Sequence, residues 1–262
     1  MENLHNYNSY DTSDKIKRVL MDKLFLGTNI YFVIGYVKQI LKAAYLVKKG
    51  QYTKKEWENS SLRITQHVER CGGKIHIRNI ENLSKCDGPI VFVGNHMSVL
   101  ETFALPFLIS KIHKTTFVVK ESLVTHPIFG TVMKSRDPIV VGRKNPREDF
   151  KAVMEQGKEK LKNGISIIVF PQSSRTVEFI PENFNTIGIK LAKAAGVKVI
   201  PIALKTDFWS NGRIIKDFGK IYRDLPIYIK FGEPMDIKGN GKAEHNQIIE
   251  FIKENLNEWN KI

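Results

Sequence analysis

From residue 74 onward, short apolar runs rich in β-branched side chains alternate with longer segments of helical periodicity. The apolar runs predict strands at residues 74–80, 89–94, 115–119, 138–141, 165–170, 197–204 and 227–231. The longer segments predict helices at residues 99–110, 146–162, 185–195 and 243–259. Strands that alternate with helices of this length indicate an α/β fold, in which a largely parallel sheet is flanked by helices.

Two of these helices have recognisable ends. Asn145 is a suitable N-cap, Pro146 fits the first turn of the helix at residues 146–162, and Gly164 follows its last turn. Gly196 follows the helix at residues 185–195 in the same way. These signals fix where the two helices begin and end independently of the hydrophobic pattern.

The first 73 residues follow a different pattern. Their most apolar stretch, at residues 24–37, is interrupted by Thr28 and Asn29 and flanked by lysines. It is shorter than the roughly 20 apolar residues of a membrane-spanning helix. Apolar and tyrosine side chains between basic flanks are typical of a helix in the lipid headgroup layer, and also of a helix that covers a soluble core. A second helix is expected at residues 54–70, which makes residues 1–73 an N-terminal helical hairpin before an α/β domain at residues 74–262.

Composition and charge narrow the class of protein. Hydrophobic residues make up 42% of the 262-residue chain and charged residues 26%, which excludes a disordered chain, a collagen-like repeat and a polytopic membrane protein. The net charge of +14 favours anionic partners: nucleic acid, an acidic membrane surface or phosphorylated substrates. The basic residues are scattered and no nucleic-acid-binding motif accompanies them, so nucleic acid is not expected as a partner.

The cysteines and the N-terminus indicate where the protein is found. The two cysteines, Cys71 and Cys86, have no metal-binding spacing, so we expect reduced intracellular thiols and no metal site. The first 14 residues are polar and lack the basic start and apolar core of a secretory signal. The chain is therefore expected on the cytoplasmic side.

The first candidate for chemistry lies at the end of the strand at residues 89–94. His96 follows that strand directly, and Glu101 comes five positions later. An imidazole acts as a general base near neutral pH when a carboxylate fixes its tautomer. Ser98 and Glu101 also fit a capping box, in which Glu101 only accepts a backbone N–H, and His96 is equally consistent with a hydrogen-bonded core histidine.

The second candidate follows the strand at residues 165–170. The chain continues there, after a proline, with Gln172, Ser173, Ser174 and Arg175. A guanidinium binds phosphate through two parallel hydrogen bonds, although a salt bridge of Arg175 to Glu178 or Glu182 is the alternative. A serine nucleophile is less consistent with this segment because no G-x-S-x-G elbow is present.

Two further cations follow strands: Lys120 after residues 115–119, and Arg143 after residues 138–141. Ligands of α/β folds bind beyond the carboxyl ends of the strands. Together with Arg175, these cations predict an anion pocket beside the His96–Glu101 pair.

The order of these segments resembles the 1-acyl-sn-glycerol-3-phosphate acyltransferase family over residues 75–204. The family block N-H-x-x-x-x-D corresponds to Asn95-His96-Met-Ser-Val-Leu-Glu101. The family's Arg block, with an upstream Lys, corresponds to Arg143 and Lys120. Its F-P-E-G-T-R-S block corresponds to Phe170-Pro-Gln-Ser-Ser-Arg175-Thr, and its V-I-P-V strand to Val199-Ile-Pro201-Ile. Three positions depart from the family pattern: Glu101 replaces Asp, Gln172 replaces Glu and Ser173 replaces Gly.

The resemblance implies an enzyme that transfers a fatty acyl group to the sn-2 hydroxyl of 1-acyl-sn-glycerol 3-phosphate, which gives phosphatidic acid. The donor would be an acyl-CoA or acyl carrier protein thioester, with no further cofactor and no metal. His96 would be the base and Glu101 its partner. The expected acceptor-binding residues are Lys120, Arg143, Gln172, Ser173, Ser174 and Arg175.

The resemblance also implies that the N-terminal hairpin is membrane-associated, as a peripheral or monotopic element on the cytoplasmic face that contacts membrane phospholipids. The changes at Gln172 and Ser173 leave the acceptor open. Another lyso-lipid or glycerol 3-phosphate is an alternative acceptor, and a catalytically silent lipid-binding protein is an alternative function.

Overall fold

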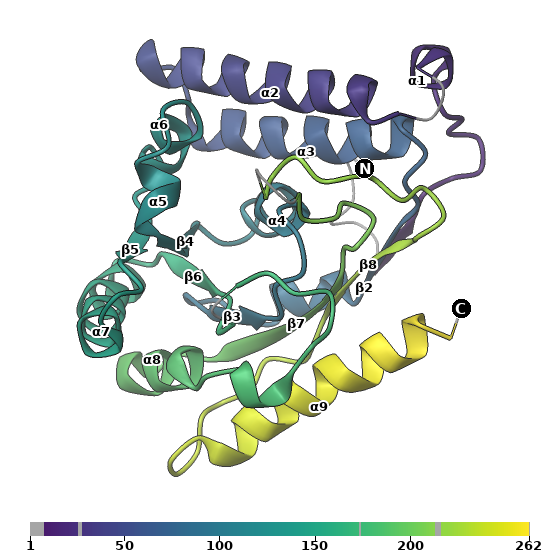
Figure 1. Cartoon of the computed structure of the whole chain (residues 1–262). Helices are drawn as coiled ribbons and strands as arrows, with labels where there is room; N and C mark the ends of the chain where they lie inside the picture. Colours follow the sequence, from purple (N-terminus) through teal and green to yellow (C-terminus); the bar gives the residue numbers. More distant parts are fainter. Residues whose placement is uncertain (1–7, 26–27, 173, 213–215, 262) are drawn as a thin grey trace.

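The computed structural model describes residues 8–25, 28–172, 174–212 and 216–261. Within them, eight strands form one sheet in the order β1-β2-β8-β7-β3-β6-β4-β5 (Figure 1). The strands are β1 (Ser9–Asp11), β2 (Ile75–Arg78), β3 (Val91–Gly94), β4 (Thr115–Lys120), β5 (Ile139–Val141), β6 (Ser166–Val169), β7 (Val199–Lys205) and β8 (Ile227–Phe231). Neighbouring strands run parallel except in the pairs β1–β2 and β7–β8, which are antiparallel. The sheet is therefore mixed, and its central part is parallel.

Helices cover both faces of this sheet. They are α1 (Leu20–Leu24), α2 (Ile30–Lys48), α3 (Lys54–Arg70), α4 (Leu100–Ile109), α5 (Glu121–Val124), α6 (Phe129–Lys134), α7 (Pro146–Lys162), α8 (Ile187–Ala195) and α9 (Lys242–Trp259). Helices α2, α3 and α4 lie on one face, and α7, α8 and α9 lie on the other (Figure 1). This arrangement confirms the predicted sheet flanked by helices.

Alternating strand residues build a separate apolar core on each face. Phe92 and Ile168 point into the core shared with α3 and α4, while Val91 and Val169 point into the core shared with α7, α8 and α9. Because both faces are covered, β3 and β6 are buried along their whole length. Their carboxyl ends are thereby held rigidly at one edge of the sheet.

The N-terminal helices differ from the expectation in where they begin. The apolar stretch at residues 24–37 is divided between α1 and α2, and α2 continues through Lys38 and Lys42. Helices α2 and α3 lie side by side (Figure 1), and Phe32 and Tyr36 of α2 belong to the same core as the sheet.

The outer side of α2 carries both apolar and basic side chains. It exposes Ile30, Ile34, Leu41 and Tyr45, with Lys38 and Lys42 among them. Among the described helices, α2 alone is long and apolar enough to cross a membrane, judged by length and composition. The membrane association of this segment stays a prediction.

Candidate active site

The carboxyl ends of four parallel strands meet around one cavity. His96 follows β3, Lys120 ends β4, Arg143 follows β5, and Arg175 follows β6. All four side chains line a cavity of about 330 Å³, together with the exposed Ser174. The structure thus brings together the cations and the histidine that the sequence places at strand ends.

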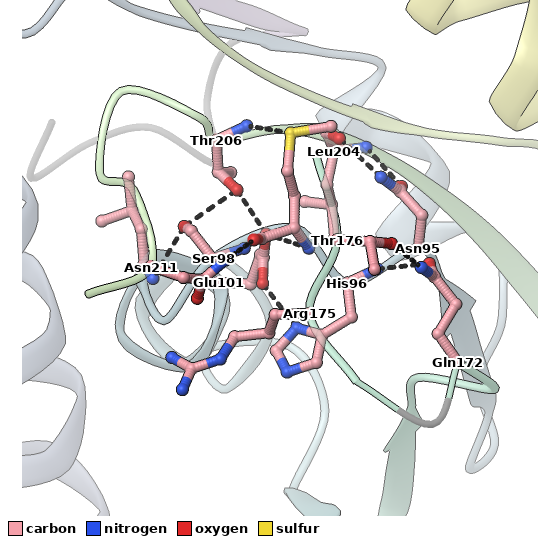
Figure 2. Close-up of polar contacts among 12 residues, drawn as sticks. Asn95, His96, Ser98, Glu101, Gln172, Arg175, Thr176, Leu204, Thr206 and Asn211 are labelled. Atoms are coloured by element: carbon pink, nitrogen blue, oxygen red, sulfur yellow. Dashed lines mark hydrogen bonds and ion pairs between the residues drawn. The ribbon is translucent and has the colours of Figure 1, made fainter. Parts of the chain in front are cut away.

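The His96 imidazole is hydrogen-bonded to the Glu101 carboxylate. Nδ1 of His96 lies 2.6 Å from Oε2 of Glu101 (Figure 2), and the Glu101 side chain is completely buried. The second carboxylate oxygen, Oε1, accepts the backbone N–H groups of Met97 at 3.0 Å and Ser98 at 2.8 Å. One oxygen therefore accepts the two backbone N–H groups just before helix α4, while the other lies against the imidazole, so the capping contact and the contact with His96 are both present. A catalytic role of the pair stays a prediction.

Thr206 is a third donor to this carboxylate. Its hydroxyl donates a hydrogen bond to Oε1 of Glu101 and accepts one from the Ser98 hydroxyl at 3.0 Å (Figure 2). Thr206 was not predicted from the sequence, although it is the first residue after the buried strand β7, much as His96 is the second residue after β3. Three donors on one oxygen hold the buried carboxylate in one orientation.

The backbone and ring of His96 are fixed from the opposite side. The Gln172 amide accepts the His96 N–H at 2.8 Å and donates to the Thr176 hydroxyl at 2.9 Å. The ring stacks on Phe170, with centroids 4.3 Å apart and planes 4° apart. No described residue is hydrogen-bonded to the second ring nitrogen, Nε2, and the side chain is 18% exposed to the cavity.

One of the expected acceptor-binding residues, Gln172, does not line this cavity. Gln172 is buried, and its amide is used within the protein as described above. Ser173 lies outside the described residues. A role of either residue in contacting the acceptor stays a prediction.

Arg175 is paired with a carboxylate from a distant segment. Its Nη1 lies 2.7 Å from Oδ1 of Asp217, which lines the same cavity. The alternative drawn from the sequence, a salt bridge of Arg175 to Glu178 or Glu182, is not found among the described residues, where Asp217 is the partner instead. An anionic ligand at Arg175 would have to compete with Asp217 for the guanidinium.

Arg143 occupies an unusual backbone conformation. Its φ angle of 56° lies in the left-handed region, which non-glycine residues adopt at a cost. The Asp149 carboxylate holds this turn by accepting the N–H groups of Gly142 at 2.8 Å and Arg143 at 2.9 Å. Asp149 in the first turn of α7 thus fixes the backbone that carries the Arg143 guanidinium.

Comparison with known proteins identifies the family. The family model described as Acyltransferase matches residues 74–205, which is half of the chain. The chain belongs to the acyltransferase family. This confirms the resemblance found in the sequence, and the matched segment contains β2 to β7 with His96, Glu101 and Arg175. Thr206 and Asp217, which contact two of these residues, lie just beyond it.

Curated relatives and one solved structure agree with this assignment. A 1-acyl-sn-glycerol-3-phosphate acyltransferase of Pseudomonas aeruginosa is 29% identical over 217 residues, covering 81% of this chain and 79% of that protein. The chloroplastic enzyme of the same name from Arabidopsis thaliana is 29% identical over 175 residues, which are 67% of this chain and 46% of that protein. The crystal structure of the 1-acyl-sn-glycerophosphate acyltransferase from Thermotoga maritima has the same fold, with a TM-score of 0.67 at 22% identity over 91% of this chain and 97% of that chain.

Proposed function

We propose that this acyltransferase moves a fatty acyl group from a thioester to the sn-2 hydroxyl of 1-acyl-sn-glycerol 3-phosphate and releases phosphatidic acid. The observation that carries the proposal is one cavity that holds a carboxylate-bound imidazole and four cations, the fourth being Lys216. Such a cavity suits an acceptor with a phosphate at one end and a reacting hydroxyl nearby. The relatives from Pseudomonas and Arabidopsis carry the name of this activity.

In the proposed mechanism, His96 is the general base. Its Nε2 removes the proton of the sn-2 hydroxyl while the oxygen attacks the thioester carbonyl carbon. The new C–O bond forms, the C–S bond then breaks, and the imidazolium returns the proton to the leaving thiolate. The Glu101 carboxylate holds the tautomer that leaves Nε2 free and stabilises the charged ring.

The cations position the acceptor. Arg175 binds the phosphate in place of Asp217, and Lys120 and Arg143 add positive charge around it. Fixing the phosphate holds the hydroxyl against Nε2, which converts an encounter of two molecules into a reaction within one complex. Positioning accounts for a large part of the rate in this scheme.

The exposed apolar side chains of α2 support a place at the membrane. These isoleucine, leucine and tyrosine side chains would enter the acyl boundary, while the flanking lysines face anionic headgroups. We propose that the protein sits on the cytoplasmic face as a peripheral or monotopic enzyme and takes both lipids from the bilayer. Binding through lysines weakens as the salt concentration rises.

A panel of acceptors tests the proposed reaction. The purified protein is given one acyl-CoA and, separately, lysophosphatidate, glycerol 3-phosphate and lysophosphatidylcholine in mixed micelles, and products are identified by mass spectrometry. We expect phosphatidic acid from lysophosphatidate and far slower turnover of the other two. Preference for another acceptor would contradict the assignment of lysophosphatidate as the substrate. Lipid binding without thioester consumption would contradict the proposed acyltransferase function.

A further inference from the structure

A second cavity, of about 420 Å³, lies on the opposite face of the same sheet edge. Its floor consists of valines from β4, β5, β6 and α7: Val118, Val141, Val169 and Val153. The turn that begins at Phe170 and the first residues of α8 close its sides. The mechanism described above makes no use of this space.

The two cavities share a wall. Val118, Arg143 and Phe170 line both of them. Phe170 is also the ring on which the His96 imidazole stacks. The second cavity therefore adjoins the cavity of the reacting imidazole at Phe170.

The chemistry of the second cavity changes from its floor to its rim. The floor is made of valines. At the rim, Lys190 lies over the Phe150 ring with its Nζ 5.4 Å from the centroid, and Phe150 is 39% exposed. A ligand that fits would have a slender, mostly uncharged body and an anionic end held near Lys190.

The proposed reaction brings two substrates to one imidazole, and this indicates which molecule would bind in the second cavity. When the acceptor phosphate occupies the cations of the first cavity, the thioester must reach His96 from another direction. A phosphopantetheine arm has the required form, because a phosphate ends a slender amide chain whose other end carries the sulfur. We propose that the second cavity binds the phosphopantetheine arm of the acyl donor, with its phosphate near Lys190; this assignment rests on the proposed function.

A charge reversal at the rim tests the assignment. Lys190→Glu is compared with Lys193→Glu, which makes the same change at an exposed position of α8 outside the cavity. The donors are palmitoyl-CoA, a palmitoyl carrier protein and palmitoyl-N-acetylcysteamine, which lacks the phosphate. We expect Lys190→Glu to raise the KM of the first two about fivefold or more, an effect that shrinks with salt, and to leave the KM of the third and of lysophosphatidate unchanged.

Comparison of the two natural donors tells whether the arm comes from coenzyme A or from a carrier protein. An unchanged donor KM in Lys190→Glu, an equal rise with N-acetylcysteamine, or an equal effect of Lys193→Glu would overturn the assignment. Equilibrium dialysis of radiolabelled coenzyme A and of phosphopantetheine separates this proposal from the proposed function because it needs no turnover. Binding of either arm that is weakened by Lys190→Glu supports the site even in the absence of acyl transfer, and no binding to the unmodified protein refutes it.

Discussion

Replacing Glu101 by Gln separates the catalytic from the structural use of this side chain. Oε1 of Glu101 accepts hydrogen bonds from Met97, Ser98 and Thr206, whereas Oε2 meets Nδ1 of His96. A glutamine has one oxygen and one NH₂ group. Three donors already point at the position of Oε1, so the glutamine oxygen must occupy that position. The NH₂ group is then placed against Nδ1 of His96.

The altered contact reverses the tautomer of the imidazole. An NH₂ group facing Nδ1 makes that nitrogen an acceptor, so the ring hydrogen moves to Nε2, where the hydroxyl proton has to be received. We expect the rate to fall by about 10²- to 10⁴-fold, or roughly 3–5 kcal/mol in activation free energy. The free energy of unfolding should change by less than about 1 kcal/mol, because no buried donor loses its acceptor.

Two assays measure these quantities: initial rates of phosphatidic acid formation and urea unfolding followed by tryptophan fluorescence. Glu101→Ala is the contrasting variant, since it removes the acceptor of two backbone N–H groups and of Thr206. We expect it to destabilise the fold by more than about 2 kcal/mol. A Glu101→Gln variant with nearly the original rate, or one that unfolds as readily as Glu101→Ala, would refute the reasoning.

Three further changes test other parts of the site and fold. Arg175→Ala should raise the KM of lysophosphatidate about tenfold or more and leave that of an uncharged lyso-lipid unchanged, and an equal loss with both acceptors would assign Arg175 a structural role. Thr206→Val should lower kcat about tenfold with little change in either KM, and Thr206→Ser should restore it; failure of the serine to rescue would contradict a hydrogen-bonding role. Burial lowers the pKa of His67 and His113, so the folded protein protonates these rings less readily than the unfolded chain, which protonates them below about pH 6.5. The free energy of unfolding should therefore fall from pH 7 to pH 5, and His113→Gln should flatten that dependence in urea titrations; an unchanged slope would contradict it.

Much of the fold could be predicted because its signals are local. Asn145 and Pro146 begin α7, and the structure has this helix at Pro146–Lys162 as predicted. Helices α5 and α6 are only four and six residues long, too short to show a hydrophobic period. Strand β1 was missed because it depends on distant contacts, among them the Tyr10 hydroxyl donating to Glu69 at 2.6 Å.

The same distinction between local signals and distant contacts explains which residues of the site could be predicted. His96, Arg143 and Arg175 could be found because each comes within six residues of the end of an apolar strand, and parallel strands end at one edge. Asp217 could not be found, because its pairing with Arg175 depends on how the chain returns after β7. Thr206 carried the signal of a polar residue after a strand, but its contact with Glu101 follows only from β7 lying beside β3.

The central claim is that His96 is the base for acyl transfer to a phosphate-bearing lipid. The most direct test compares initial rates of phosphatidic acid formation for the unmodified protein, His96→Ala and His76→Ala, whose histidine lies on β2 away from the cavity. We predict a loss of about 10²-fold or more for His96→Ala alone, with the folded structure retained as judged by circular dichroism. A rate for His96→Ala equal to that of His76→Ala would contradict the account.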